Sequence, residues 1–286
     1  MSEAFEAHRR HLTGLAYRML GSMADGEDIV QEAFLRWQAE RRADVREPRA
    51  FLSKMVTRMC LDELKSARVQ REEYVGPWLP EPILDDSALS PEAATEVAAD
   101  LSVALLLALE RLSPLERAAF LLHDVFDVDF AEIAETLGRN EAACRQLAAR
   151  ARANVAAARP RFKPSEDESR RLAQAFMAAA ASGDTKGLAQ LLAQDAVFYS
   201  DGGGKVRAAM RPILGAERVA QFITAVLRQY PQPPRSVRYT HINGLPGFLI
   251  ETSDGLLQTN AFDIRDGKIA AIYSVRNPDK LKHLRH

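Results

Sequence analysis

The stretch from Asp129 to Ala157 constrains the fold more than any other part of the chain, because it carries the pattern of two helices joined by a tight turn. The apolar residues of its first half recur at i, i+3, i+4 and i+7, as on one face of a helix: Phe130, Ile133, Ala134 and Leu137. Gly138 is a typical helix stop, and the side chain of Asn140 can cap the helix that follows. The pattern predicts a helix-turn-helix.

The second helix, from Glu141 to Ala157, has an inner face of small and apolar residues that includes Cys144, which we interpret as a core residue. A recognition helix would turn Glu141, Ala142, Arg145 and Gln146 toward base edges, and Asn140 at its start would be a further DNA-binding residue. Basic residues placed near phosphates follow: Arg150, Arg152, Arg159, Arg161 and Lys163. The alternative is an ordinary helical hairpin with a solvated basic face. The absence of Asp and Glu between Arg145 and Lys163 favours DNA.

Composition limits the classes of protein that this chain can represent. Its 286 residues predict two or three domains, and its net charge of −1 means that any DNA contact must come from local patches. Two distant cysteines, Cys60 and Cys144, indicate a reducing compartment without a disulfide framework. The longest apolar run, Val103 to Leu109, is too short to cross a bilayer, so we expect a cytoplasmic protein without a membrane partner.

Three helical patterns precede residue 73. The first is Phe5 to Leu20, and the second is expected to begin with Asp25 as its cap and to carry an acidic face. The third, Arg49 to Arg71, has an apolar side and a mostly basic side. A helical bundle with solvated charges explains these faces. The alternative is that the acidic helix binds a basic partner protein and that the basic helix holds a melted DNA strand.

Two sequence motifs decide between these alternatives. The segment GSMADGEDIVQEAFLRW, followed by EPRAFLSKMVTRMCLDEL, resembles the N-terminal domain of extracytoplasmic-function (ECF) sigma factors. The resemblance implies that the second helix binds the largest subunit of RNA polymerase through Asp25, Asp28, Gln31, Glu32 and Phe34. It also implies that a helix from Thr57 to Arg71 melts and reads the downstream promoter element. Its DNA-binding residues would be Arg58, Asp62, Lys65 and Arg68.

The helix-turn-helix belongs to the second of these motifs. The segment LERLSPLERAAFLLHDVFDVDFAEIAETLGRNEAACRQLAARAR resembles the C-terminal domain of the same family, which reads the upstream promoter element. The two motifs occur in the order that the family has, about one small domain apart.

Residues 73–100 form an acidic, proline-containing linker that lacks Lys and Arg. Its prolines disfavour helix, and a solvated linker is one interpretation. Trp78 and Leu79 favour the alternative, that the linker binds to another part of the chain. YVGPWLPEP resembles a motif of the ECF subgroup that carries a C-terminal SnoaL-like domain, and we expect Trp78 and its neighbours to bind that domain.

Residues 165–286 change from helical to strand patterns. Helical patterns are followed by four strand-like runs: Val237–Ile242, Gly247–Thr252, Leu256–Ile264 and Ile269–Val275. Hairpin signals lie at Ser253-Asp254-Gly255 and Arg265-Asp266-Gly267. This order predicts an α+β cone with helices on a curved antiparallel sheet, and it resembles the SnoaL-like fold.

Several cones of this kind are enzymes that use a carboxylate base and an opposing acid in an apolar pocket. The candidates for such roles are Tyr199, Asp201, His241, Asn260 and Asp263. Their spacing does not assemble an acid–base pair, so we assign no catalytic residue, metal or cofactor. DGGGK, by itself a flexible hairpin loop, and NPDKL resemble motifs of the same subgroup. The resemblance implies a contact surface between this domain and the rest of the chain: Trp78, Leu79, Asp201, Gly202, Gly203, Gly204, Lys205, Asn277, Pro278 and Asp279.

The predicted architecture is multidomain. A sigma N-terminal helical domain (1–72) is followed by the linker (73–100), a helix-turn-helix domain (101–164) and a SnoaL-like regulatory domain (165–286). The resemblance implies a monomeric alternative sigma factor that binds core RNA polymerase and promoter DNA and is modulated by its C-terminal domain, which could take a small ligand. The alternatives are a one-component regulator with a ligand-binding domain, and an enzyme fused to a DNA-binding module.

Overall fold

The computed structural model describes residues 2–39, 45, 47–72, 74–84, 103–156, 165–230 and 232–284. The chain divides into two compact units. Unit 1 comprises Met1–Glu73 and Leu105–Arg159, and unit 2 comprises Tyr74–Ala104 and Pro160–His286. Within the described residues, no helix is both long and apolar enough to cross a membrane.

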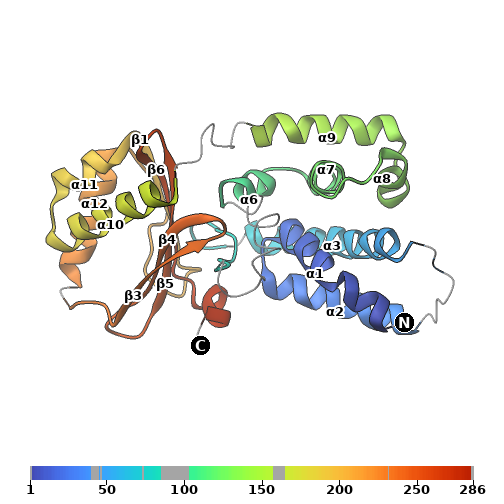
Figure 1. The fold of residues 1–286 in the computed structure, drawn as a ribbon, viewed down its shortest axis with the longest axis horizontal. Coiled ribbons are helices and arrows are strands. Elements are labelled where there is room, and N and C mark those ends of the chain that lie inside the picture. Colours follow the sequence, from blue (N-terminus) through green and yellow to red (C-terminus); the bar gives the residue numbers. More distant parts are fainter. Residues whose placement is uncertain are drawn as a thin grey trace. The chain divides into compact units, whose positions relative to one another are not determined.

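The N-terminal part of unit 1 is built from three helices (Figure 1): α1 (Ser2–Leu20), α2 (Met23–Ala39) and α3 (Pro48–Glu72). The expected cap of the second helix was wrong. Asp25 lies inside the first turn of α2, and its backbone amide donates to the Ser22 hydroxyl at 3.2 Å. Ser22 and Asp25 both suit helix N-termini, and the left-handed Gly21 (φ 73°) places Ser22 at the cap.

The second part of unit 1 contains α6 (Val103–Glu110), α7 (Pro114–Phe120), the π-helical turn η1 (Leu121–Val125), α8 (Phe130–Leu137) and α9 (Glu141–Ala156). The predicted helix-turn-helix is α8 and α9. Gly138 ends α8 with φ 62°, and the Asn140 side chain accepts the amide of Ala143 at 2.8 Å. Cys144 is fully buried in α9. The stop, the cap and the core cysteine are confirmed.

Unit 2 places three helices on one face of a six-stranded sheet (Figure 1). The helices are α10 (Glu166–Ser182), α11 (Thr185–Leu191) and α12 (Ala216–Gln229). The strands are β1 (Leu192–Asp201), β2 (Ile213–Leu214), β3 (Ser236–Ile242), β4 (Leu245–Glu251), β5 (Leu257–Arg265) and β6 (Lys268–Val275). The chain continues into a short 3-10 helix, η2 (Pro278–Leu284).

The sheet order is β2-β1-β6-β5-β4-β3, and the expectation of a wholly antiparallel sheet was wrong. β1 pairs in parallel with β6, whereas the other neighbours are antiparallel. The last four strands form a meander through tight turns, and the parallel pair arises because β1 lies beside the last strand of that meander. The predicted cone therefore has a mixed sheet.

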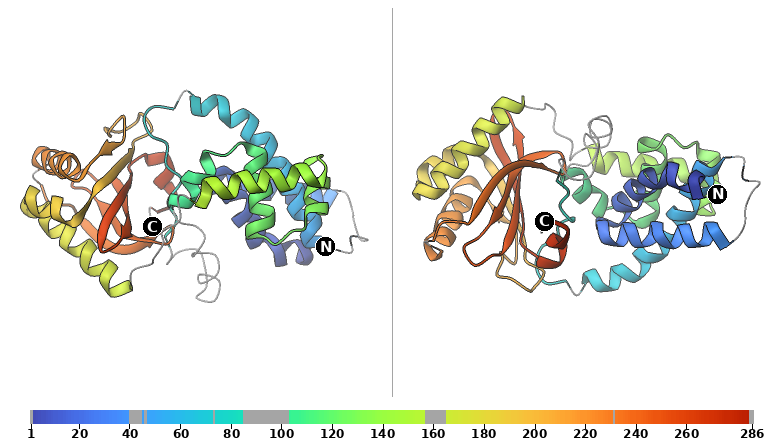
Figure 2. Two further views of the ribbon diagram at one scale, coloured as in Figure 1. Left: turned by 90° about the horizontal axis from the view of Figure 1, so that it is seen from above. Right: turned by 60° about the horizontal axis from the view of Figure 1, so that its bottom comes forward.

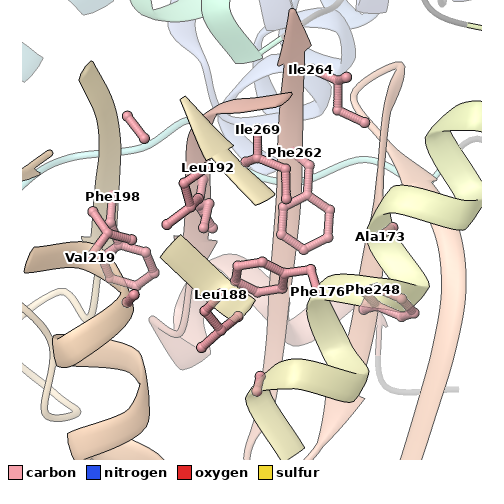
Figure 3. Packing of buried hydrophobic residues seen from close by; sticks show 14 of the residues in the cluster. Ala173, Phe176, Leu188, Leu192, Phe198, Val219, Phe248, Phe262, Ile264 and Ile269 are labelled. Atoms are coloured by element: carbon pink, nitrogen blue, oxygen red, sulfur yellow. The ribbon is translucent and has the colours of Figure 1, made fainter. Parts of the chain in front are cut away.

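Aromatic rings fill the space between the helices and the sheet (Figure 3). Phe176 of α10 packs against Phe262 of β5 with ring centres 5.1 Å apart, and Phe248 of β4 lies 6.1 Å from Phe262. The face of α10 that packs on this core carries Ala173, Phe176 and Ala180. This core fixes the sheet, whose opposite face carries the contacts described next.

Candidate polymerase, DNA and linker-binding sites

The exposed side of α9 carries the predicted base-contacting residues. Glu141, Ala142, Arg145 and Gln146 are exposed. Arg145 donates to Glu141 at 2.6 Å, and its guanidinium lies 5.2 Å from the centre of the Phe130 ring. Stacking and pairing hold this guanidinium on the surface. Base-edge hydrogen bonds can replace its bond to Glu141, because Arg145 belongs to the exposed start of the helix.

The arginines further along α9 are paired with acids of the same half of unit 1. Arg150 lies 3.2 Å from Glu116, and Arg152 lies 2.5 Å from Asp124. These surface pairs contribute little to stability, so phosphates can compete for both guanidinium groups. The remaining predicted phosphate contacts, Arg159, Arg161 and Lys163, lie outside the described residues.

The acidic face of α2 is exposed as predicted. Asp25, Asp28, Gln31 and Glu32 all face solvent, and one apolar neighbour that was not predicted, Leu35, is exposed beside them. An apolar residue next to an acidic stripe is typical of a protein-binding surface, whose centre is apolar and whose rim is charged.

Phe34 differs from the other predicted polymerase contacts because it is half-buried against α1. Its ring meets Phe5 edge-to-face at 5.1 Å, and the Arg9 guanidinium lies 5.3 Å from each ring centre. Gly26 explains the close approach of these helices, since a Cβ there would lie 3.2 Å from the Tyr17 nitrogen. Phe34 therefore positions α2 on α1.

The predicted DNA-binding residues of α3 have two different environments. Asp62 and Lys65 are exposed and pair with each other at 2.7 Å. Arg58 is instead engaged within unit 1, where its guanidinium donates to the backbone oxygens of Thr136 and Glu135 at the end of α8. The side chain of Arg68 lies outside the described residues.

Part of the linker, residues 74–84, belongs to unit 2 and lies on the sheet face opposite the three helices (Figure 2). We call this segment the docked linker. Its contacts centre on the carboxylate of Asp201 at the end of β1, which is fully buried. That carboxylate accepts the Tyr74 hydroxyl at 2.5 Å and the amide of Leu79 at 2.8 Å. The amide of Gly203 also donates to it at 3.0 Å.

Lys280 of η2 completes this site. Its ammonium lies 2.7 Å from the carboxylate of Asp201 and donates to the backbone oxygen of Leu79 at 2.5 Å. It also faces two linker rings, 4.1 Å from the centre of Trp78 and 5.0 Å from that of Tyr74. A cation between two aromatic faces and a carboxylate is stabilised from three directions. This lysine was not among the predicted site residues, although it is the fourth residue of the NPDKL motif.

The far end of the docked linker is held at the β3–β4 turn and at η2. The Ile83 amide donates to the side-chain oxygen of Asn243 at 3.1 Å, and the Asn243 amide donates to the Ile83 oxygen at 2.8 Å. Leu84 forms an antiparallel bridge with Ile242. His283 places one ring nitrogen 2.8 Å from the Pro82 oxygen and the other 3.0 Å from the Glu81 carboxylate.

The glycine motif lies in the connection between the antiparallel strands β1 and β2 and supports the same site. Gly203 has φ 60°, and a Cβ there would lie 2.2 Å from the Asn277 amide nitrogen, which donates to the Tyr74 hydroxyl. A Cβ on Gly204 would meet Val75 of the linker at 3.1 Å. Gly202 is buried, Lys205 pairs with Asp279, and Pro278 begins η2.

The five candidate catalytic residues are not brought together. Asp201 binds the linker, and Tyr199 stacks on Tyr273 at 5.4 Å. His241 lies 2.9 Å from Glu166 of α10. Asp263 is 2% exposed and pairs with Arg265 at 2.6 Å. Asn260 lies on β5 opposite Ser274.

Comparison with known families matches the two parts of unit 1 separately. Residues 4–69 match the family model "Sigma-70 region 2", and residues 102–155 match "Sigma-70, region 4". The α2 surface and α3 thus belong to the first region and the helix-turn-helix belongs to the second, which defines a two-region sigma factor.

Full-length relatives identify the family more closely. The chain is 41% identical to the ECF RNA polymerase sigma factor SigJ of Mycobacterium tuberculosis, over 96% of this chain and 91% of the relative. It is 34% identical to the probable ECF sigma factor SigI of that organism, over 100% and 96%. The crystal structure of SigJ superposes with a TM-score of 0.79 at 38% identity, covering 99% and 98% of the two chains. This chain belongs to the ECF RNA polymerase sigma factors.

Proposed function

We propose that this ECF sigma factor positions core RNA polymerase at promoters through three of the surfaces described above. The acidic face of α2, with Leu35 beside it, binds the polymerase. The start of α9 reads the upstream element, and the exposed side of α3 contacts the downstream element. The observation that supports this assignment is that the predicted polar residues of α2 and the predicted base-contacting residues of α9 are exposed on separate helices of the two matched regions. A protein that acts on core polymerase works in the cytoplasm.

We further propose that the SnoaL-like domain regulates the sigma regions by holding the docked linker. A linker bound to Asp201 and Lys280 is withheld from any surface of the polymerase. The cone interior is filled by the rings of Phe176, Phe248 and Phe262, so we assign regulation to the linker site and not to a ligand pocket. The protein acts as a monomer in this scheme, since its regulator is part of its own chain.

Run-off transcription with purified core polymerase tests the first proposal. The assay uses the full chain and its Trp78→Ala variant. This substitution weakens binding of the linker without altering the hydrophobic core of unit 2. We expect a promoter-specific transcript, and more of it from Trp78→Ala. The pair Asp28→Lys and Glu32→Lys should abolish the transcript, whereas Glu3→Lys, a matched reversal at an exposed position of α1, should not.

The alternatives predict different results. A one-component regulator binds its operator as a dimer and gives no new transcript with core polymerase alone. If neither chain yields a transcript or associates with the polymerase, the proposed function is wrong.

A further inference from the structure

We infer that Phe130 is a positioning residue for promoter reading, because its ring holds the guanidinium of Arg145 at the start of α9. This hold determines how strongly Arg145 discriminates one base pair of the upstream element. The inference rests on the proposed function, since it deepens the role given to α9. It concerns three side chains from three elements, which we call the recognition stack: His123 of η1, Phe130 of α8 and Arg145 of α9.

The ring of Phe130 contacts both other members of the recognition stack. The centre of the His123 ring lies 4.1 Å from its centre, with 33° between the two planes. The Arg145 guanidinium carbon lies 5.2 Å from the same centre, within the distance at which a ring attracts a cation. The apolar pattern of α8 predicted Phe130 for its core face, yet the ring is only half-buried and binds a cation.

The backbone around Phe130 fixes the ring before any DNA is bound. Phe130 is the first residue of α8, and the preceding Asp129 caps this helix by accepting the Glu132 amide at 2.9 Å. Nδ1 of His123 lies 3.0 Å from the Val128 oxygen and donates to it, since a carbonyl oxygen can only accept. One short segment therefore positions both rings.

The π-helical turn η1 explains how His123 reaches this segment. The Phe126 amide donates to the Leu121 oxygen, five residues earlier, at 3.0 Å. Such turns interrupt the α-helical pattern and are frequent at functional sites. Here η1 turns His123 toward Phe130, while the next residue, Asp124, pairs with Arg152 of α9. Two neighbouring residues of η1 thus contact the helix-turn-helix.

The recognition stack leaves Arg145 able to read a base. Its side chain is 57% exposed, and its Nη2 donates to Glu141 at 2.6 Å. A ring engages the face of a guanidinium, whereas hydrogen bonds to a base use its edge, so the other N–H groups remain available. An arginine that is already positioned loses less side-chain freedom when it binds. Phe130 should therefore strengthen the discrimination that Arg145 provides.

The two later arginines of α9 have a different environment. Arg150 and Arg152 pair with the carboxylates of Glu116 and Asp124. A phosphate can replace such a carboxylate, and phosphate contacts carry no sequence information directly. Substitution of these arginines should weaken binding to all promoters alike, which makes them controls for the recognition stack.

Selection of promoter DNA by the holoenzyme tests the inference. Purified core polymerase and the full chain are incubated with DNA whose upstream element is randomised, and sequencing of the bound DNA gives the base preference at each position. Arg145→Ala identifies the position that Arg145 reads, because the preference there should fall by about 5- to 100-fold.

Phe130→Leu should lower the preference at this one position by about 2- to 5-fold. Phe130→Tyr keeps an aromatic ring and should restore it. His123→Ala leaves the Phe130 ring in place without its neighbour, and should lower the same preference by less. Arg150→Gln should reduce the amount of bound DNA without changing the preference at any position. A role of Phe130 in packing alone would give this last result.

Nuclear magnetic resonance of the free full chain measures the recognition stack without DNA. The Phe130 ring should shift the side-chain resonances of Arg145 upfield in wild type and in Phe130→Tyr, and Phe130→Leu should abolish this shift. The inference is overturned if Arg145→Ala changes no single position, or if Phe130→Leu keeps the full preference or loses it equally at all positions. A wild-type holoenzyme that selects no sequence overturns the proposed function instead, and the resonances still report whether the stack exists.

Discussion

The ammonium of Lys280 lies 2.7 Å from the carboxylate of Asp201, and this pair is completed by the linker. Asp201 is fully buried and the side chain of Lys280 is 12% exposed. The Tyr74 hydroxyl and the Leu79 amide donate to the same carboxylate. Release of the linker would remove two donors from a charge that is costly to bury without partners. The ion pair therefore couples the state of the linker to the stability of its binding site.

Asp201→Asn should weaken linker binding by about 3–5 kcal/mol, because it leaves the Lys280 ammonium without its counterion. Trp78 reports this release through a red-shifted emission and stronger quenching by acrylamide. Trp37 is 3% exposed in unit 1 and should be quenched little in either protein. Asp266→Asn, at an exposed left-handed position of the β5–β6 turn, is the control and should leave the emission unchanged. Equal quenching of Trp78 in Asp201→Asn and wild type would contradict the role given to this carboxylate.

Tyr74→Phe removes one hydroxyl that donates to Asp201 and accepts from Asn277 at 3.0 Å. Linker binding should weaken by about 1–2 kcal/mol, as for a hydrogen bond to a charged group. Burial, followed by the hydrogen bond to Asp201, raises the pKa of Tyr74 above its usual value.

This pKa shift also gives linker binding a dependence on alkaline pH. The bound phenol keeps its proton more strongly than the free one, so the stabilisation is complete below the usual tyrosine pKa of about 10 and is lost as the pH rises above it. Trp78 quenching between about pH 8 and 11 should increase in wild type. Tyr74→Phe should bind the linker more weakly across this whole pH range, and its Trp78 quenching should not rise with pH. If Trp78 quenching rises equally in both proteins, another group is responsible for the pH dependence.

Two left-handed glycines provide a matched test of the close contact at Asn277. Gly203 and Gly138 have φ of 60° and 62°, so alanine at either position should cost about 1–2 kcal/mol in backbone conformation. A Cβ at Gly138 meets nothing within 4 Å, whereas at Gly203 it would meet Asn277 at 2.2 Å. Gly203→Ala should therefore destabilise unit 2 by about 1–3 kcal/mol more than Gly138→Ala destabilises unit 1. Urea unfolding monitored by circular dichroism measures the loss of stability caused by each substitution. Equal losses would show that the Asn277 side chain moves away from the new Cβ without a cost in free energy.

The parts of the structure that local chemistry determines could be predicted from the sequence. Gly138 and Asn140 predicted the turn of the helix-turn-helix, because a left-handed stop and a cap depend on neighbouring residues alone. Asp266-Gly267 predicted the β5–β6 turn for the same reason. The cap of α2 was misassigned because Ser22 and Asp25 have the same chemistry and only the path of the chain distinguishes them.

Contacts between distant segments could not be predicted in this way. The parallel pairing of β1 with β6 joins strands far apart in the chain, and no local signal specifies it. The basic side of α3 predicted Arg58 as a DNA contact, and its exposed side chain also donates to the end of α8, since a helix C-terminus attracts cations much as a phosphate does. Lys280 was missed for a related reason, because its partners come from a linker about 200 residues earlier.

His11 makes the contact between the two sigma regions sensitive to acid. Its Nε2 lies 3.0 Å from the Ser53 hydroxyl of α3, and its ring meets Phe126, next to η1, edge-to-face at 4.8 Å. Burial lowers the pKa of His11 to about 4, and the charges of Arg49, His8 and Arg18 add to this effect. The ring is therefore neutral in the folded protein at pH 7.

The unfolded chain binds a proton on His11 below about pH 6.5, whereas the folded protein does so only near pH 4. Stability should therefore be complete above pH 6.5 and fall as the pH decreases toward 4, by about 1–2 kcal/mol after solvent screening of the partly exposed ring. Urea midpoints at pH 7 and 5 measure this loss in wild type and in His11→Gln, whose amide can still bond to Ser53. The loss should be smaller in His11→Gln and unchanged in His8→Gln. If acid destabilises His11→Gln as much as wild type, protonation of another group opens the contact between the regions.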